Sequence, residues 1–68
     1  MKISINGIHK EFDSKTSMLD AVTAELNGKE SKGIAAALND TIVPKQKWQE
    51  TELNENDRIE IVYAVQGG

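Results

Sequence analysis

The chain is short, mildly acidic and free of cysteine, with 68 residues and a net charge of -3. A chain of this length buries only about 60% of its unfolded surface, so an enclosed active site would remove much of its core. Because cysteine is absent, the chain has no disulfides and no thiolate metal ligands. The charge argues against binding to phosphate backbones, and no stretch resembles a membrane span or a signal peptide. We therefore expect a cytoplasmic protein that is not an enzyme and binds no metal, nucleic acid or membrane.

The first half of the sequence predicts a β-hairpin and one helix. Residues 2–5 (KISI) and 8–12 (IHKEF) alternate polar and apolar side chains, and Asn6 and Gly7 between them suit a tight turn because both tolerate positive φ. Ser17 can cap a helix together with Asp20 three residues later, and Gly28 supplies the stop. The apolar stripe of this helix consists of Met18, Leu19, Val22 and Leu26.

The second half predicts three further strands. Residues 34–38 (IAAAL) and 41–43 (TIV) flank a second turn, and Pro44 ends this hairpin because proline has no N–H to donate. Residues 45–57 have no clear period and indicate irregular backbone with a short helical turn, in which Trp48 is expected to cover the core. Residues 58–65 (RIEIVYAV) become continuously apolar from Val62 to Val65, which is typical of a strand covered on both faces or docked against something. We expect this strand in the middle of the sheet.

This order of elements, ββαβββ, predicts an α+β protein with a β-grasp (ubiquitin-like) fold. One main helix then covers one face of a mixed five-stranded sheet, and the last strand lies parallel to the first, between the first and the third strands. We assign residues 1–65 to the β-grasp domain and residues 66–68 to a flexible C-terminal diglycine tail.

The final Gly67 and Gly68 carry the strongest chemical signal. Glycine has no Cβ, so two in succession can enter a narrow channel and leave the terminal carbonyl carbon unshielded. The terminal carboxylate is ionised at neutral pH and can attack the α-phosphate of ATP, and the acyl-adenylate that forms accepts sulfur or an amine. We expect Gly68 to be modified, and Gly67, Gln66, Val65 and Val62 to serve as tail and partner-binding residues. No residue of the chain is assigned a catalytic role.

Three segments, LNDTIVPKQKW, ETEL and NDRIEIVYAVQGG, resemble the ThiS family of ubiquitin-like sulfur carrier proteins of thiamine biosynthesis. The resemblance covers essentially the whole chain, with departures at Asp40 and Gln66, where the family often has glycine. It implies that an E1-like adenylating enzyme of the ThiF type adenylates the Gly68 carboxylate. It also implies that a cysteine desulfurase route supplies sulfur for a thiocarboxylate, which donates its sulfur to thiazole synthase of the ThiG type. The carrier itself would bind no cofactor, because the partner uses the ATP.

Other interpretations stay open. The same tail chemistry would suit a carrier of the molybdopterin synthase small-subunit type or a ubiquitin-like modifier joined to lysines, and an inert tail would suit a small interaction domain. His9 is expected to face solvent, since one histidine without cysteine cannot build a zinc site. A group of carboxylates is expected to form a solvated acidic surface. These residues are Asp20, Glu25, Glu50, Glu52, Glu55 and Asp57.

Overall fold

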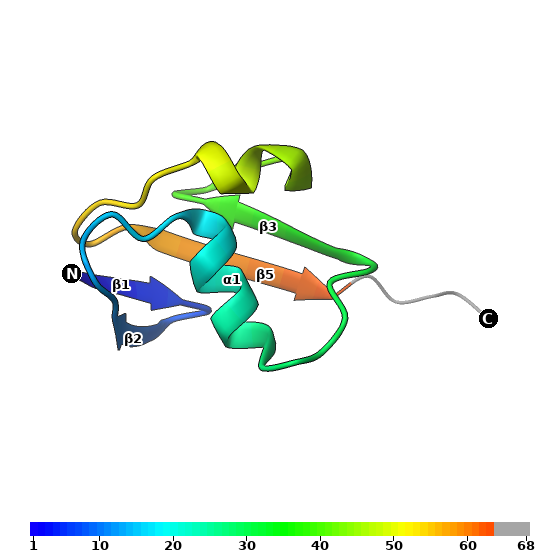
Figure 1. Ribbon diagram of the computed structural model, residues 1–68, viewed down its shortest axis with the longest axis horizontal. Coiled ribbons are helices and arrows are strands. Elements are labelled where there is room, and N and C mark those ends of the chain that lie inside the picture. Colours follow the sequence, from blue (N-terminus) through cyan, green and yellow to red (C-terminus); the bar gives the residue numbers. More distant parts are fainter. Residues whose placement is uncertain (64–68) are drawn as a thin grey trace.

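The computed structural model describes residues 1–63, which form one mixed sheet with a helix packed on it (Figure 1). The strands are β1 (Lys2–Ile5), β2 (Ile8–Glu11), β3 (Ile34–Leu38), β4 (Thr41–Ile42) and β5 (Arg58–Tyr63); the helices are α1 (Met18–Leu26) and the short 3₁₀ helix η1 (Lys45–Glu50). The five strands lie in the order β2-β1-β5-β3-β4. β1 and β5 are parallel, and the other neighbours are antiparallel. The predicted β-grasp arrangement, with its last strand between the first and the third, is confirmed.

Both predicted hairpins are present, and each turns through two residues with positive φ. Asn6 and Gly7 have φ values of 51° and 84°, and Asn39 and Asp40 have values of 49° and 72°. Two central residues in the left-handed region are the mark of a type I′ turn, whose twist matches that of the flanking strands. Aspartate tolerates this conformation, so Asp40 supports the turn in place of a glycine.

Helix α1 begins where the sequence predicts. Ser17 Oγ accepts a hydrogen bond from the Asp20 N–H at 3.0 Å, and the Asp20 carboxylate accepts one from the Ser17 N–H at 3.5 Å, which completes a capping box. At the other end Asn27 already has a φ of 50°, so the left-handed stop starts one residue before Gly28. The buried side chains of α1 are Met18, Ala21, Val22 and Leu26.

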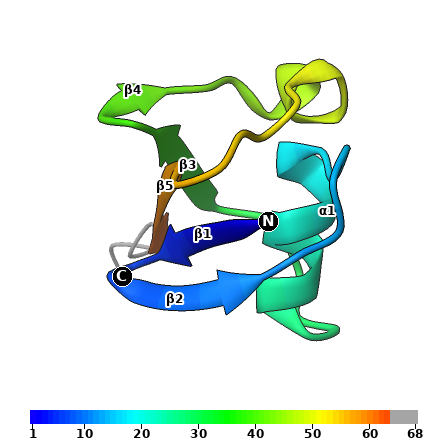
Figure 2. The same ribbon diagram turned by 90° about the vertical axis from the view of Figure 1, so that its left-hand side faces the viewer.

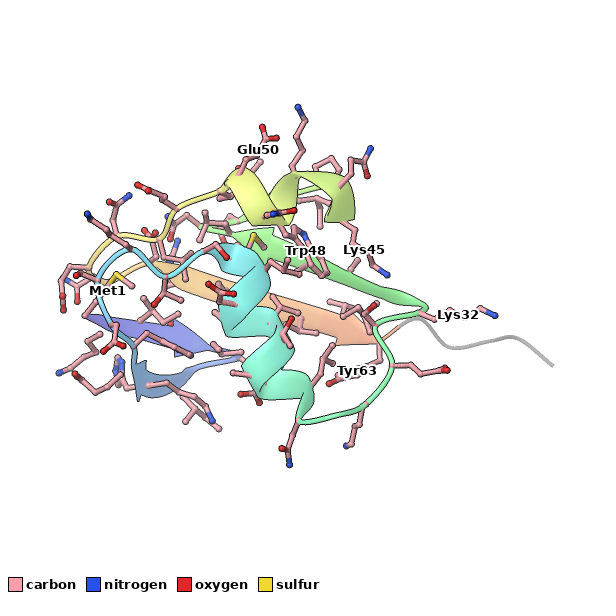
Figure 3. All side chains as sticks on the ribbon, viewed as in Figure 1. Met1, Lys32, Lys45, Trp48, Glu50 and Tyr63 are labelled. Atoms are coloured by element: carbon pink, nitrogen blue, oxygen red, sulfur yellow. The ribbon has the colours of Figure 1, made fainter. Side chains whose placement is uncertain are left out.

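The core lies between α1, η1 and one face of the sheet, and Trp48 closes it. Figure 2 shows α1 and η1 on the same side of the sheet, and Figure 3 shows Trp48 pointing inward from η1. The Trp48 side chain is 1% exposed, and its Nε1 donates to the Val43 carbonyl at 2.8 Å. This bond satisfies the indole N–H inside the core and ties η1 to the end of the second hairpin. The predicted role of Trp48 is confirmed. We call the sheet face opposite α1 the open face, because no described element covers it.

Strand β5 buries alternate side chains and exposes the others. Ile59 and Ile61 face the core and are 1% and 6% exposed, whereas Val62 and Tyr63 are 60% and 51% exposed. Of the two alternatives expected for this apolar run, coverage on both faces is wrong at Val62, because residues 1–63 place nothing over the open face; docking against something stays a prediction. Residues 64 and 65, which belong to the same expected run, lie outside the described residues.

Asp57 is buried, although the sequence analysis placed it on a solvated acidic surface. Its exposed fraction is 9%, its Oδ1 accepts from Asn39 Nδ2 at 3.0 Å, and its Oδ2 accepts from the Asn54 N–H at 2.7 Å. Asn39 Oδ1 in turn accepts from the Arg58 N–H at 2.9 Å. This network joins the turn before β5 to the second hairpin and explains why the carboxylate is taken out of water. Of the other predicted surface carboxylates, Glu25 is half-buried and Asp20, Glu50, Glu52 and Glu55 are exposed.

Candidate docking surface at the end of β5

Val62 is the one predicted site residue that lies within residues 1–63. Val65, Gln66, Gly67 and Gly68 lie outside the described residues, as does the predicted boundary between domain and tail, so their roles stay predictions. The candidate site is therefore the part of the domain around the end of β5, from which the chain continues toward these residues (Figure 1).

Val62 belongs to a small apolar area that we call the open-face patch. Directly paired residues of neighbouring strands point to the same face of a sheet. Val62 pairs with Ala35 on β3, and Ala37 pairs with Ile42 on β4. The patch thus consists of Val62, Ala35, Ala37 and Ile42. Val62 and Ile42 are 60% and 64% exposed, and the small alanines between them keep the surface shallow, which suits contact with another protein.

Val62 was predicted from the sequence as a partner-binding residue, but the other members of the patch were not. Residues 34–38 are apolar throughout, so alternation does not show which alanines face away from the core. The face of Ile42 depends on the register of the hairpin. A register counted outward from the two-residue turn at Asn39 and Asp40 would have paired residue 37 with residue 42 and so placed Ile42 beside the patch.

Asn6 connects the first hairpin to the end of β5. Its backbone N–H donates to the Ile59 carbonyl at 2.9 Å, and its side-chain Oδ1 accepts from the Ile61 N–H at 2.8 Å. The backbone pairing between β1 and β5 ends at Ile5 and Ile59. The Asn6 side chain therefore supplies one more hydrogen bond beyond the last strand pair and fixes the point where β5 separates from β1. From the sequence, Asn6 was predicted to form part of the turn, and this second role was not expected.

Exposed lysines gather at the end of the molecule where β5 ends. Lys29 and Lys32 lie in the segment between α1 and β3, and Lys45 Nζ donates to the Ser31 carbonyl in that segment at 2.9 Å. Figure 3 shows Lys32, Lys45 and Tyr63 toward this end and Met1 at the opposite one. No ion pair within residues 1–63 includes these lysines. The three lysines outnumber the one exposed carboxylate of the same segment, Glu30, so this end is more basic than the net charge of the chain indicates.

Two open depressions lie elsewhere on the described surface. The first has a volume of about 270 Å³ and is lined by Ser4, Gly7, Asp40, Arg58, Ile59 and Glu60. The second has a volume of about 610 Å³ and is lined by Met1, Glu11, Phe12, Asp13 and Ser14.

In the part of the chain that the structure describes, no three His, Cys, Asp or Glu side chains are grouped to hold a metal ion. Nor is any helix there long and apolar enough to cross a membrane. His9 is exposed, as predicted.

Comparisons with known proteins agree with this geometry. The ThiS family model matches residues 3–68. The chain is 37% identical over its full 68 residues to "Thiazole synthase" of Paramagnetospirillum magneticum, and it spans about a fifth (20%) of the length of that relative. It is also similar to the crystal structure of the thiamine biosynthesis protein ThiS from Geobacter metallireducens, with a TM-score of 0.82, 20% sequence identity and full coverage of both chains.

The fold and the exposed end of β5 define a β-grasp domain of the ubiquitin-like class. The ThiS crystal structure shares this fold over its whole length, although at 20% identity the likeness concerns the fold alone. The family match covers all but the first two residues, so this chain belongs to the ThiS family.

Proposed function

We propose that this chain is a sulfur carrier of thiamine biosynthesis whose working group is the carboxyl group of Gly68. The observation that carries the proposal is the match to the ThiS family model, which extends to residue 68 and so includes both final glycines. The proposal requires Gly68 to be the last residue of the working protein, because a carboxyl group inside a peptide bond cannot be adenylated.

The proposed chemistry has three stages, of which the first two load the carrier. A Gly68 carboxylate oxygen attacks the α-phosphorus of ATP, and pyrophosphate leaves with the electrons of the broken P–O bond. A persulfide supplied by a cysteine desulfurase then attacks the acyl carbon and displaces AMP. A thiol then attacks the cysteine sulfur of the resulting acyl disulfide and breaks its S–S bond. The carrier keeps a thiocarboxylate, and the thiol forms a mixed disulfide with the cysteine that had carried the persulfide.

In the third stage the thiocarboxylate sulfur attacks a carbonyl carbon of a sugar-derived precursor on thiazole synthase; the C=O π bond opens and its oxygen takes up a proton. Hydrolysis of the thioester that forms leaves the sulfur on the precursor and restores the Gly68 carboxylate. The relative named thiazole synthase, which contains a stretch similar to this entire chain, supports this choice of recipient.

In this proposal the domain contributes binding surface, and the partners contribute the catalytic groups. The open-face patch offers the exposed Ala35 and the half-buried Ala37 between two exposed apolar side chains, one of which, Val62, lies on the strand that leads toward Gly68. An E1-like adenylating enzyme that covers this patch would hold the domain while Gly67 and Gly68 enter its active site. The same patch is then free to meet thiazole synthase after the adenylating enzyme has dissociated.

The experiment is to incubate the purified chain with its adenylating enzyme, ATP, cysteine, a cysteine desulfurase and a thiol, and to measure the intact mass. We expect a mass increase equal to the exchange of one oxygen for sulfur, located on Gly68 by fragmentation. Matched controls are a chain that lacks Gly68 and a chain with one alanine added after it, and neither should be modified.

Three results would contradict the proposal. The first is modification of either control chain to the extent seen with the unaltered chain. The second is a ladder of lysine conjugates in cell extract, which would indicate a protein modifier. The third is undisturbed growth without thiamine of a strain whose only copy carries the added alanine.

A further inference from the structure

Strand β5 extends beyond its parallel neighbour and leaves part of one edge without a strand. β1 pairs with β5 at Arg58 and Ile59, and the chain then turns away at Asn6. On the other edge β3 pairs with β5 as far as Tyr63. The last residues of β5 are therefore paired on the β3 side and lie beyond the end of β1 on the other side (Figure 1).

The direction of the backbone groups on this edge follows from the hydrogen bonds. The Ile59 carbonyl accepts from Asn6 N–H and the Ile61 N–H donates to Asn6 Oδ1, so both residues direct their backbone groups toward the β1 side. Backbone groups alternate along a strand, so Tyr63 directs its N–H to the same side. Within residues 1–63 the Ile61 carbonyl and the Tyr63 N–H have no hydrogen-bond partner. We call these two groups the free edge of β5.

The surroundings of the free edge suit an added strand. Val62 faces the open face and Tyr63 the α1 side, and both side chains are more than half exposed. The Asn6 side chain already accepts a hydrogen bond from the Ile61 N–H, which is the backbone group just before the free edge. An incoming strand can therefore begin to pair only after that group. Proteins usually protect exposed strand edges, and an edge that is left unprotected serves as a template for another strand.

We propose that the free edge of β5 pairs with an extended segment of the adenylating enzyme, which adds a strand in line with β1. The inference rests on the proposed function, which requires an enzyme to reach the residues that follow Tyr63. A strand paired at Ile61 and Tyr63 holds the following chain extended and aims it into the active site of that enzyme. Because the hydrogen bonds involve backbone groups, recognition at this point depends on main-chain geometry more than on side-chain identity.

The location of the free edge favours an enzyme over a second copy of the chain. Gly68 is only five residues beyond Tyr63, a reach of at most about 18 Å, so any protein that acts on it comes close to the free edge, whereas a second copy has no such requirement. Each copy also carries a net charge of -3, which disfavours close association of two copies.

The test compares two substitutions at one position. Tyr63→Pro removes the N–H of the free edge, and Tyr63→Ala removes the side chain but keeps the N–H. Neither removes a hydrogen bond to β3, since the Tyr63 N–H points away from that strand, so both variants should fold. We expect the concentration of chain that half-saturates ATP-dependent adenylation to rise roughly tenfold for Tyr63→Pro relative to Tyr63→Ala, the effect of one lost interface hydrogen bond. Equal values for the two variants would overturn the proposal.

Amide hydrogen exchange of the unaltered chain gives an independent reading that does not need the proline variant to fold. We expect the Tyr63 amide to exchange rapidly in the free chain and to become protected when the adenylating enzyme is added without ATP. An unprotected Tyr63 amide in the complex would overturn strand pairing even if Gly68 becomes thiocarboxylated. Protection that appears with rising chain concentration and no enzyme would assign the free edge to self-association and also overturn it. Protection by the enzyme without any modification of Gly68 would instead uphold the pairing and contradict the sulfur-carrier function.

Discussion

Replacement of Val62 by glutamine tests whether the open-face patch meets the adenylating enzyme. Val62 is 60% exposed, and full burial of a valine side chain contributes about 1.5–3 kcal/mol, so a partner that covers the exposed part gains about 1 kcal/mol. Val62→Gln loses this gain and also places an incompletely paired amide in the interface, at a cost of about 1 kcal/mol more. The expected sum of about 2 kcal/mol is a roughly 30-fold lower kcat/KM for Gly68 adenylation. Glutamine is uncharged and leaves long-range steering unchanged.

Ile8→Gln is the matched control for this substitution. Ile8 is 62% exposed, almost the same as Val62, and it pairs with Ile5, whose side chain faces α1, so it does not belong to the open-face patch. In a denaturant titration the free energy of unfolding of both variants should lie within about 1 kcal/mol of that of the unaltered chain, because both residues are exposed and lie in strands. Adenylation is followed as pyrophosphate release at low concentrations of the chain. If both variants reduce kcat/KM equally, or if neither does, the open-face patch is not the contact surface.

Three further substitutions test the scaffold. Trp48→Ala should lower the free energy of unfolding by about 3–5 kcal/mol, because it removes the largest buried side chain and its hydrogen bond to Val43. The total stability expected for 68 residues is about 3–10 kcal/mol. Circular dichroism should therefore show a partly or fully unfolded chain. Ser17→Ala should lower this free energy by about 1 kcal/mol through loss of the helix cap, and a Ser17→Asp variant that fails to restore it would contradict the capping role. Asn6→Gly keeps the positive φ but removes the acceptor of the Ile61 N–H, so we expect the free energy of unfolding to fall by about 1 kcal/mol and hydrogen exchange at Ile61 to become faster. Exchange at Val43, whose N–H donates to the Ala36 carbonyl in the second hairpin, should change less.

The features that depend on neighbouring residues were predictable from the sequence. The turn at Asn6 and Gly7 needs two residues that tolerate positive φ, and the cap at Ser17 needs an acceptor and a partner three residues apart. The central place of β5 followed from its apolar run and from the long connection that precedes it. In each case the physical cause lies within a few residues of its effect, or in the pattern of a whole segment.

The features that depend on distant residues were not predictable in the same way. Asp57 is buried because Asn39, 18 residues away, donates to its carboxylate, and no local pattern indicates this contact. The bond from the Ile61 N–H to Asn6 joins residues 55 positions apart. The open-face patch likewise depends on the register of β3 against two strands. These contacts exist only once the sheet has formed, which is why the sequence alone indicated Val62 but not its neighbours.

The position of β5 has a mechanical consequence for the proposed carrier function. A strand in the middle of a sheet is held by hydrogen bonds on both edges, and β5 also places Ile59 and Ile61 in the core. When a partner pulls on the residues beyond Tyr63, the force acts first on the part of β5 after Ile61, which is paired only with β3. It then acts on the part before Ile61, which cannot move unless the hydrogen bonds to both β1 and β3 break. A load applied to β4 would instead fall on an edge strand of two residues that is paired on one side only. In the proposed carrier, the central place of β5 would therefore let successive partners pull on the residues beyond Tyr63 while the domain stays folded.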